Sequence, residues 1–477
     1  MLINLILKEI EDHLKSLRFM LTMLLLIIMM AVSAVLFIPE YKQQMEDYSR
    51  KTNETLDQIS RNAERNAAIF RVFSFNWTGP WVYKGPNHLG FISDGYEKEL
   101  PNAFSPSAFR IYGPVKRTRT NLLLWRSDSL DWAIIIGIIL SFASLLLVYD
   151  AVCGERENGT LRLSLVNSVS RSTILFSKFL GALTVLSIGL ITGIIVNLLL
   201  LLIIGNIPIT GNDWFIILIS FIFSVVYISV FLMLGLFIST LSRESTTSLV
   251  VSLLSWVLLV IIIPRAGGLI SSKIVKINKY SLALTNANRL RSEAMDNYNK
   301  NNPEMENSFS SGHWSPGEPL ERAFVGSDAW SNAFDEYRNQ MIYQVEVARK
   351  ITMISPAACF QYGMEALTES GLSHYKTFFN QVKNHKLALR QFLTDSYPLP
   401  LKWHAWNSSI PQVQRDEERA KIIQITPDFE SIPKFQEKKS DFPELISNSL
   451  IHFAVLMLFI VLFFTSAFVK FMKYDVR

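Results

Sequence analysis

The chain has 477 residues, of which 49% are hydrophobic and only 18% are charged. Long apolar runs alternate with polar segments, which excludes an ordinary soluble protein and indicates a membrane protein with soluble parts. The net charge of +5 is small and no dense basic tract is present, so nucleic-acid binding is unsupported. The two cysteines, Cys153 and Cys359, form neither a disulfide framework nor a metal-binding pattern.

The first segment, residues 1–18, is amphipathic. One helical face carries the apolar residues Leu2, Ile6, Ile10, Leu14 and Leu17. Such a helix is expected to lie in the cytoplasmic interface of the membrane. It would serve either as a connecting helix that braces a partner or as a simple membrane anchor.

Six segments are apolar over about 20 residues, the length that a helix needs to cross a hydrocarbon core of roughly 30 Å. They are residues 19–38, 132–150, 179–204, 214–238, 245–264 and 449–469. The first run is longer than a typical signal-peptide core, so we expect an uncleaved span. The predicted fold is an all-α polytopic membrane protein with six transmembrane helices.

Basic residues in the short connections predict the orientation. The connection 151–178 carries four basic residues and the tail 470–477 carries three, whereas residues 205–213 carry none. Both termini are therefore expected on the cytoplasmic side of the plasma (inner) membrane. Two long segments, 39–131 and 265–448, are then expected outside.

The outside segments differ in pattern. Residues 40–71 repeat apolar side chains at helical spacing and should prolong the first span, whereas aromatic residues broken by turn signals after residue 72 favour short strands. Segment 265–448 has mostly helical patterns, with Ser355 as an expected N-cap before Pro356 and Gly371 as an expected helix stop. We expect a mainly helical, mixed α/β extracytoplasmic domain.

The connection 151–178 contains a short charged element between two spans. Acidic residues suit the start of a helix, and Asn158-Gly159 favours two short pieces joined by a bend before Leu161, Leu163 and Leu165. A short amphipathic helix along the membrane can sit in a groove of a partner protein. A plain interfacial loop is the alternative.

The stretch ERENGTLRLSLVNSVSRSTILFSKFLGALTV, residues 155–185, resembles a segment of ABC-2 type transporter permeases. The residues that match the family pattern are Glu155, Arg156, Glu157, Gly159, Thr160, Leu161, Ser170, Arg171, Lys178 and Phe179. The resemblance implies a six-helix architecture like that of type V exporters. It also implies that Glu155–Leu161 with Ser170 and Arg171 form a coupling helix that contacts a separate ATPase subunit.

A second stretch, residues 354–382, resembles the extracytoplasmic domain of one ABC-2 subgroup. This subgroup is described by similarity with multicopper-enzyme maturation permeases and places a large domain between its last two spans. The resemblance therefore agrees with a domain at 265–448.

Motifs for chemistry on this chain are absent. The sequence contains no GxxxxGK[ST] phosphate-binding loop, HExxH or GxSxG, and its seven histidines are scattered. His452, at the outer boundary of the last span, is expected to make a polar interface contact. We expect no catalytic, cofactor or metal site here, with ATP and Mg²⁺ bound by the partner ATPase.

The predicted function is the permease subunit of an ATP-driven exporter. Its partners would be the ATPase, a second permease that is identical or homologous, membrane lipids and an extracytoplasmic protein. Lys116, Arg117, Arg119 and Arg126 would meet lipid phosphates or form a solvated surface. The alternative is a membrane signalling or scaffold protein that relays binding at 265–448 without translocation, and the substrate stays open.

Overall fold

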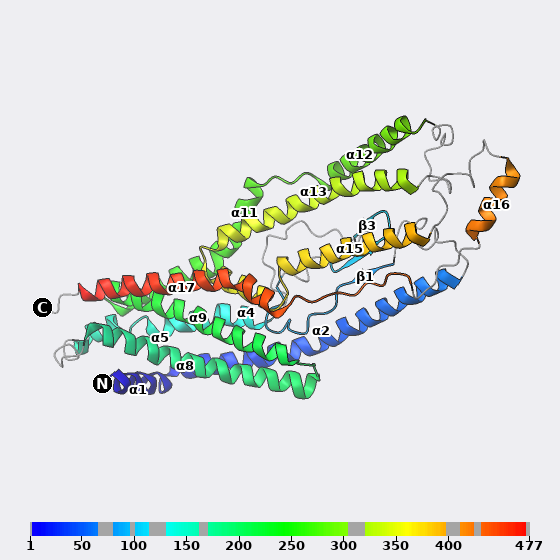
Figure 1. Ribbon diagram of the computed structural model, residues 1–477. Helices are drawn as coiled ribbons and strands as arrows, with labels where there is room; N and C mark the ends of the chain where they lie inside the picture. Colours follow the sequence, from blue (N-terminus) through cyan, green and yellow to red (C-terminus); the bar gives the residue numbers. More distant parts are fainter. Residues whose placement is uncertain are drawn as a thin grey trace.

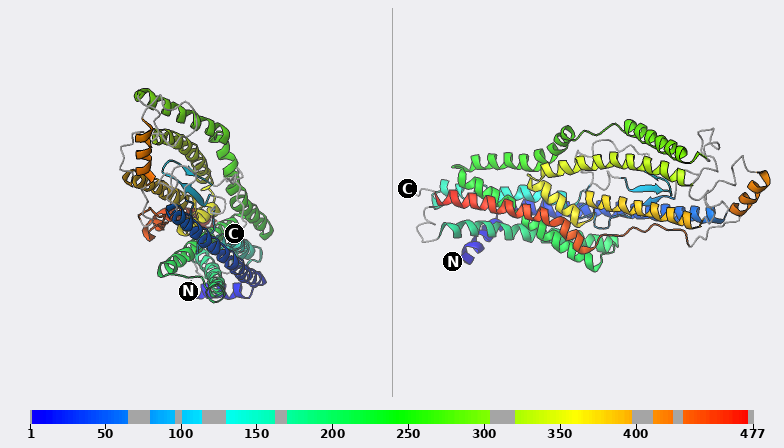
Figure 2. Two further views of the ribbon diagram at one scale, coloured as in Figure 1. Left: turned by 90° about the vertical axis from the view of Figure 1, so that its right-hand side faces the viewer. Right: turned by 45° about the horizontal axis from the view of Figure 1, so that its top comes forward.

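The computed structural model has two parts. A helical bundle holds both chain ends at one side, and an elongated part built around α12, α13, α15 and three strands extends away from the opposite side (Figures 1 and 2). The structure describes residues 2–64, 80–95, 101–113, 130–161, 170–303, 320–396, 411–423 and 431–473. The basic cluster at 116–126, together with Leu163 and Leu165, lies outside these ranges.

Six helical stretches of the described chain are long and apolar enough to cross a membrane, and each contains one of the predicted spans. An all-α polytopic membrane protein is thereby confirmed. The elements that build these stretches are α2 (Leu17–Glu64), α4 (Trp132–Ile135), η2 (Ile136–Leu140), α5 (Ser141–Val148), α6 (Cys153–Glu157), α8 (Arg171–Leu200), η3 (Leu201–Gly205), α9 (Gly211–Leu241), α10 (Ser245–Trp256), η4 (Val257–Ile262), α11 (Ile263–Ile274) and α17 (Phe442–Met472). The η elements are π-helical turns inside otherwise α-helical spans.

Several helices continue beyond their apolar runs. The first span carries on past Pro39 as one helix to Glu64, so that α2 leaves the bundle and runs along the elongated part (Figure 1). This agrees with the predicted outward prolongation. Backbone hydrogen bonds of a helix do not require apolar side chains, so a polar continuation can follow a membrane span directly.

The elongated part is mainly helical. It contains α12 (Tyr280–Asn301), α13 (Leu320–Thr352), α15 (Leu372–Ser396) and α16 (Gln412–Ile423). The strands β1 (Val82–Tyr83), β2 (Ala103–Pro106) and β3 (Ile111–Tyr112) form a small antiparallel sheet. The sheet packs on α15 through Phe104, whose ring centroid lies 5.1 Å from that of Phe379.

One short helix of this region, α14 (Pro356–Leu367), packs against the bundle itself. Ser355 caps it by accepting a hydrogen bond from the Ala358 amide, and Pro356 occupies its first turn, as the sequence predicts. On the bundle side, the Phe360 ring stacks on Tyr227 of α9 at a centroid distance of 4.3 Å. The aromatic contact joins residues far apart in sequence and makes α14 part of the bundle core.

The predicted stop of α14 at Gly371 is wrong by several residues. The helix ends at Leu367, and Glu369 rather than a glycine takes the left-handed backbone conformation, with φ of 54°. Two contacts hold this turn: the Ser370 amide donates to the Glu365 carbonyl, and the Ser440 amide donates to the Glu369 carboxylate. Tertiary contacts thus fix a conformation that an L side chain rarely adopts.

Candidate functional site

The charged element between the second and third spans lies at the end of the bundle that holds the chain termini (Figure 1). It begins as α6, Cys153–Glu157, which ends just before Asn158. Gly159 has φ of +73°, the left-handed conformation that favours glycine. The bend predicted at Asn158-Gly159 is therefore present, and the second predicted piece lies mainly in 162–169, outside the described residues.

The start of α6 is fixed to α9 and its end to α10. The backbone amides of Val152 and Cys153 donate to the Ser239 hydroxyl at 3.0 and 3.2 Å. The Glu157 carboxylate accepts hydrogen bonds from the amide (3.0 Å) and the hydroxyl of Ser245, the first residue of α10. A carboxylate is favourable at this helix N-terminus.

A buried lysine joins α6 to two more helices. The Lys178 ammonium on α8 donates to Glu155 at 2.6 Å and to Glu9 of α1 (Leu2–Leu14) at 3.0 Å, and its side chain is only 6% exposed. The helices α1 and α8 approach closely here, because a Cβ at Gly181 would lie 2.7 Å from the Cβ of Glu9. We call Glu9, Lys178 and Glu155 the Lys178 triad.

The remaining matched residues also have local roles. Ser170 caps α8 through the Thr173 amide, and Arg171 donates to the terminal carbonyls of Phe471 and Met472 on α17. A cation is favourable at such a helix C-terminus. Leu161 is buried with Val152, Ile174 and Phe471.

Only part of the matched motif is therefore available for contact with another protein. Glu155 and Glu157 bond to other helices of the same chain, although Glu157 is itself exposed. Asn158, Gly159 and Thr160, which follow in the turn, are exposed as well. A Cβ at Gly159 would meet nothing within 4 Å. The turn 158–160 is thus the protruding part of the element that the structure describes.

Sequence reasoning missed Glu9, Ser239 and Ser245 as partners of this element. Glu9 lies on the amphipathic helix beside Ile10, which packs against the core, and a carboxylate next to an apolar face was the available signal. The two serines carried none, because hydroxyls are common in membrane spans.

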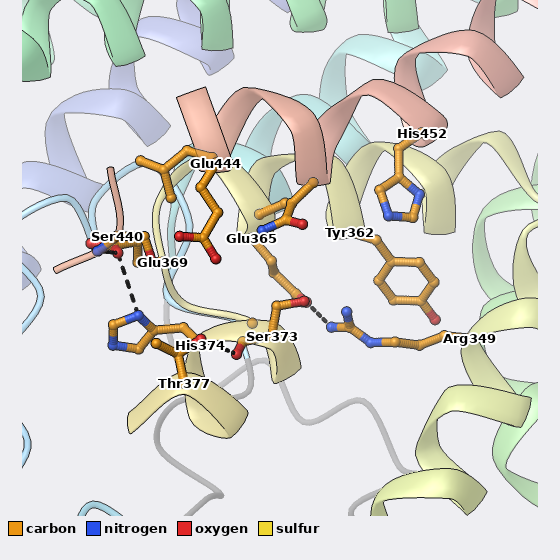
Figure 3. A pocket seen from close by; sticks show the side chains of 14 residues that line it. Arg349, Tyr362, Glu365, Glu369, Ser373, His374, Thr377, Ser440, Glu444 and His452 are labelled. Carbon is orange, nitrogen blue, oxygen red and sulfur yellow. Dashed lines mark hydrogen bonds and ion pairs between the residues drawn. The ribbon is translucent and has the colours of Figure 1, made fainter. Parts of the chain in front are cut away.

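A second candidate lies at the opposite end of the bundle, where α13, α14, α15 and α17 converge around a polar cavity (Figure 3). Arg349 and Glu365 form an ion pair in this cavity, and the Glu365 side chain is 1% exposed. Burial raises the pKa of Glu365 although Arg349 opposes that shift. The Arg349 guanidinium lies 4.4 Å from the centroid of the Tyr362 ring. The His452 ring packs edge-on against the same tyrosine, with the two ring centroids 5.9 Å apart.

Among the described residues, no group of three or more His, Cys, Asp or Glu side chains is placed to hold a metal ion. Glu444 points into the space between Glu365 and His374 (Figure 3). His452 of α17 makes an edge-to-face ring contact with Tyr362, and its Nδ1 atom has no hydrogen-bond partner among the described residues, so the polar contact expected for it is not seen there. No sequence pattern predicted the cavity, because the residues that line it are separated by up to about a hundred positions.

Comparison with known proteins bears on the whole chain. The model of a family described as ABC-2 family transporter protein matches residues 3–476. A search of curated proteins finds no match.

Proposed function

Since the chain belongs to the family of ABC-2 transporter proteins and is a permease component of an ABC transporter, we propose that it couples ATP hydrolysis by a separate ATPase subunit to the outward movement of a substrate. The ATPase would bind ATP and Mg²⁺, and it would contact the permease at the element between the second and third spans. A second permease, identical or homologous, would complete the transporter.

The observation that carries this proposal is the way the element is tied to the bundle. Through the Lys178 triad it holds α1 and α8, and through Ser239 and Ser245 it holds α9 and α10. A displacement of α6 by a partner would therefore act on four helices together. A ligand or partner shifts a conformational equilibrium only through contacts that differ between the two states.

The expected contact residues are Glu155, Arg156, Glu157, Gly159, Thr160, Leu161, Ser170 and Arg171, and two groups within this element have different roles in the proposal. Glu155, Glu157, Ser170 and Arg171 would transmit force, because their side chains hold α6, α8, α10 and α17. The turn at Asn158, Gly159 and Thr160 would touch the ATPase, because it protrudes. Replacing the first group would weaken folding as well as coupling, so the second group offers the cleaner test.

Asn158→Trp in the complete transporter tests the contact. Asn158 has a right-handed backbone conformation and an exposed side chain, so the variant should fold, but the indole would obstruct a docked ATPase. We expect its affinity for the ATPase to fall about tenfold or more, equivalent to about 1.4 kcal/mol. Copurification and ATPase activity in nanodiscs measure this.

Asn212→Trp is the matched control, since Asn212 is also exposed and lies in the first turn of α9, on the expected outer side. It should bind the ATPase as the unmodified protein does. Unchanged affinity in Asn158→Trp, or equal losses in both variants, would contradict docking at this turn.

A further inference from the structure

A histidine in the elongated part lies between two carboxylates. The His374 Nε2 atom is 3.3 Å from Glu437 Oε1, its Nδ1 atom is 3.5 Å from Glu369 Oε1, and the side chain is 7% exposed. A neutral imidazole carries one N–H and can donate to only one of them, whereas an imidazolium donates on both sides. The arrangement therefore favours the protonated ring.

The two carboxylates are themselves held by backbone groups. Glu369 accepts from the Ser440 amide at 2.6 Å, and Glu437 accepts from the Gly85 amide at 2.7 Å. Each acid is thus held in place by a backbone N–H donor, and its other acceptor sites stay available to the His374 ring. A neutral His374 would leave two adjacent negative charges without a cation between them.

The three residues come from parts of the chain that are far apart. Glu369 lies in the turn after α14, His374 in the first turn of α15, and Glu437 in the extended segment that leads into α17. Through Gly85 the contact also reaches the first outside insertion. The cluster thus joins the α14–α15 turn to the segment entering the last span.

We propose that Glu369, His374 and Glu437 form a proton-binding site on the outer side of the molecule, and that the bound proton locks the α14–α15 turn to the segment 431–441. With the proton bound, one cation bridges two anions across these segments. Without it, the two carboxylates repel each other and the contact opens. The inference concerns a site separate from the cytoplasmic element and does not depend on ATPase coupling.

The surrounding charges set the direction of the pH dependence. Burial lowers the pKa of His374, but the nearby carboxylates of Glu369 and Glu437 outweigh burial and the charge of Lys84, so the pKa is raised. Glu444 of α17 and the Arg349–Glu365 pair line the same cavity (Figure 3). The lock is complete below the ordinary histidine pKa of about 6.5 and is lost as the pH rises through the raised value.

Hydrogen–deuterium exchange of the full chain in nanodiscs tests the site. After correction for the intrinsic effect of pH, exchange of amides in 431–441 should accelerate between about pH 6 and about pH 9. One linked proton limits the increase to about tenfold per pH unit. In His374→Gln the corrected exchange should be fast throughout and independent of pH.

His385→Gln is the control variant. His385 lies on the same helix, is 8% exposed and packs against Phe435 of the same segment, at a centroid distance of 5.5 Å. Burial lowers its pKa to about 4, so it is neutral over the whole range and its replacement should leave the acceleration in place.

Glu437→Gln is the second test variant and retains His374. Losing one of the two anions lowers the affinity for the proton, so the acceleration should begin at lower pH than in the unmodified protein. The inference is overturned if His374→Gln keeps the pH dependence of the unmodified chain, or if Glu437→Gln leaves its position unchanged.

Discussion

At the scale of single residues, Lys178 holds the Lys178 triad together, because it pairs with both acids. Lys178→Met replaces the ammonium group with an apolar side chain of similar size. The carboxylates of Glu9 and Glu155 then face each other without the cation. Removing one partner of a buried ion pair costs about 3–5 kcal/mol. Because both acids are partly exposed, we expect the free energy of unfolding in detergent to fall by about 3 kcal/mol, at the lower end of that range.

The comparison variant is Lys15→Met, since Lys15 pairs with Glu11 on the exposed face of the same amphipathic helix. Its free energy of unfolding should hardly change, because exposed ion pairs contribute little to stability. Adding Glu9→Gln and Glu155→Gln to Lys178→Met should recover much of the loss. An undiminished loss in that triple variant would mean that packing, not charge, explains the effect.

Asp131, at the start of the second span, provides a pH test of its own. Its carboxylate accepts from the amides of Ile134 (2.8 Å) and Asp94 (2.9 Å), and burial raises its pKa from 3.8 to about 7. The folded chain therefore binds this proton more tightly than the unfolded chain. Its contribution to stability is complete below about pH 4 and is lost as the pH rises to about 7.

Asp131→Asn cannot ionise, and its single oxygen can replace Oδ1 as the acceptor for the Ile134 amide, whereas the bond from the Asp94 amide to Oδ2 is lost at every pH. The difference in melting temperature between Asp131→Asn and the unmodified chain should move in favour of the variant as the pH rises from about 5 to about 7, and then level off. Melting curves across that range measure it. A difference that is constant with pH would contradict the raised pKa of Asp131 in the folded chain.

The motif residues could be predicted from the sequence, but their contacts could not. The spacing of Glu155, Glu157 and Gly159 identified the element, and the left-handed Gly159 agrees with the predicted bend. The partners Glu9 and Ser245 became apparent only from the packing of helices, because no local pattern specifies which distant side chain a carboxylate will meet.

At the scale of elements, the close packing of α14 on α9 depends on the absence of a side chain at Gly363. A Cβ there would lie 2.2 Å from the Phe223 ring, which is itself buried and stacked with Phe360. Gly363→Ala should therefore force the two helices apart and destabilise the fold by about 1–3 kcal/mol. The melting temperature of the purified chain reports this.

Gly211→Ala gives the comparison for a helical glycine with open space, since nothing lies within 4 Å of a Cβ at that position. We expect it to melt at or slightly above the temperature of the unmodified chain, because Ala favours helix. Equal melting temperatures for Gly363→Ala and Gly211→Ala would contradict tight packing of α14.

Apolar runs predicted where the spans lie, yet they did not predict α14 inside the bundle core. Twelve residues are too few to signal a membrane element, and the helix has the composition of an ordinary buried helix. The stacking partner Tyr227 is more than a hundred positions away in sequence. The prediction that α14 stops at Gly371 was wrong for the same reason, because Ser440, a distant residue, holds the turn at Glu369.

At the scale of the whole molecule, the two candidate sites lie at opposite ends of the bundle. The Lys178 triad is at the end with both termini, and the polar cavity is where the elongated part begins (Figures 1 and 3). The even number of spans and the shared side of the termini followed from the sequence. The elongated shape of the molecule could not be predicted, because the apolar pattern ends where α2 leaves the bundle.

The unbroken course of α2 sets the scale of movement open to such a molecule. Its 48 residues measure about 72 Å from one tip to the other, and it starts beside the Arg18–Asp150 ion pair at the end with the termini. If the rod stays straight, a rotation of about 5° about that tip carries the far tip through about 6 Å. A rearrangement too small to alter side-chain contacts at one extremity would thus be magnified into a shift larger than the diameter of a water molecule at the other.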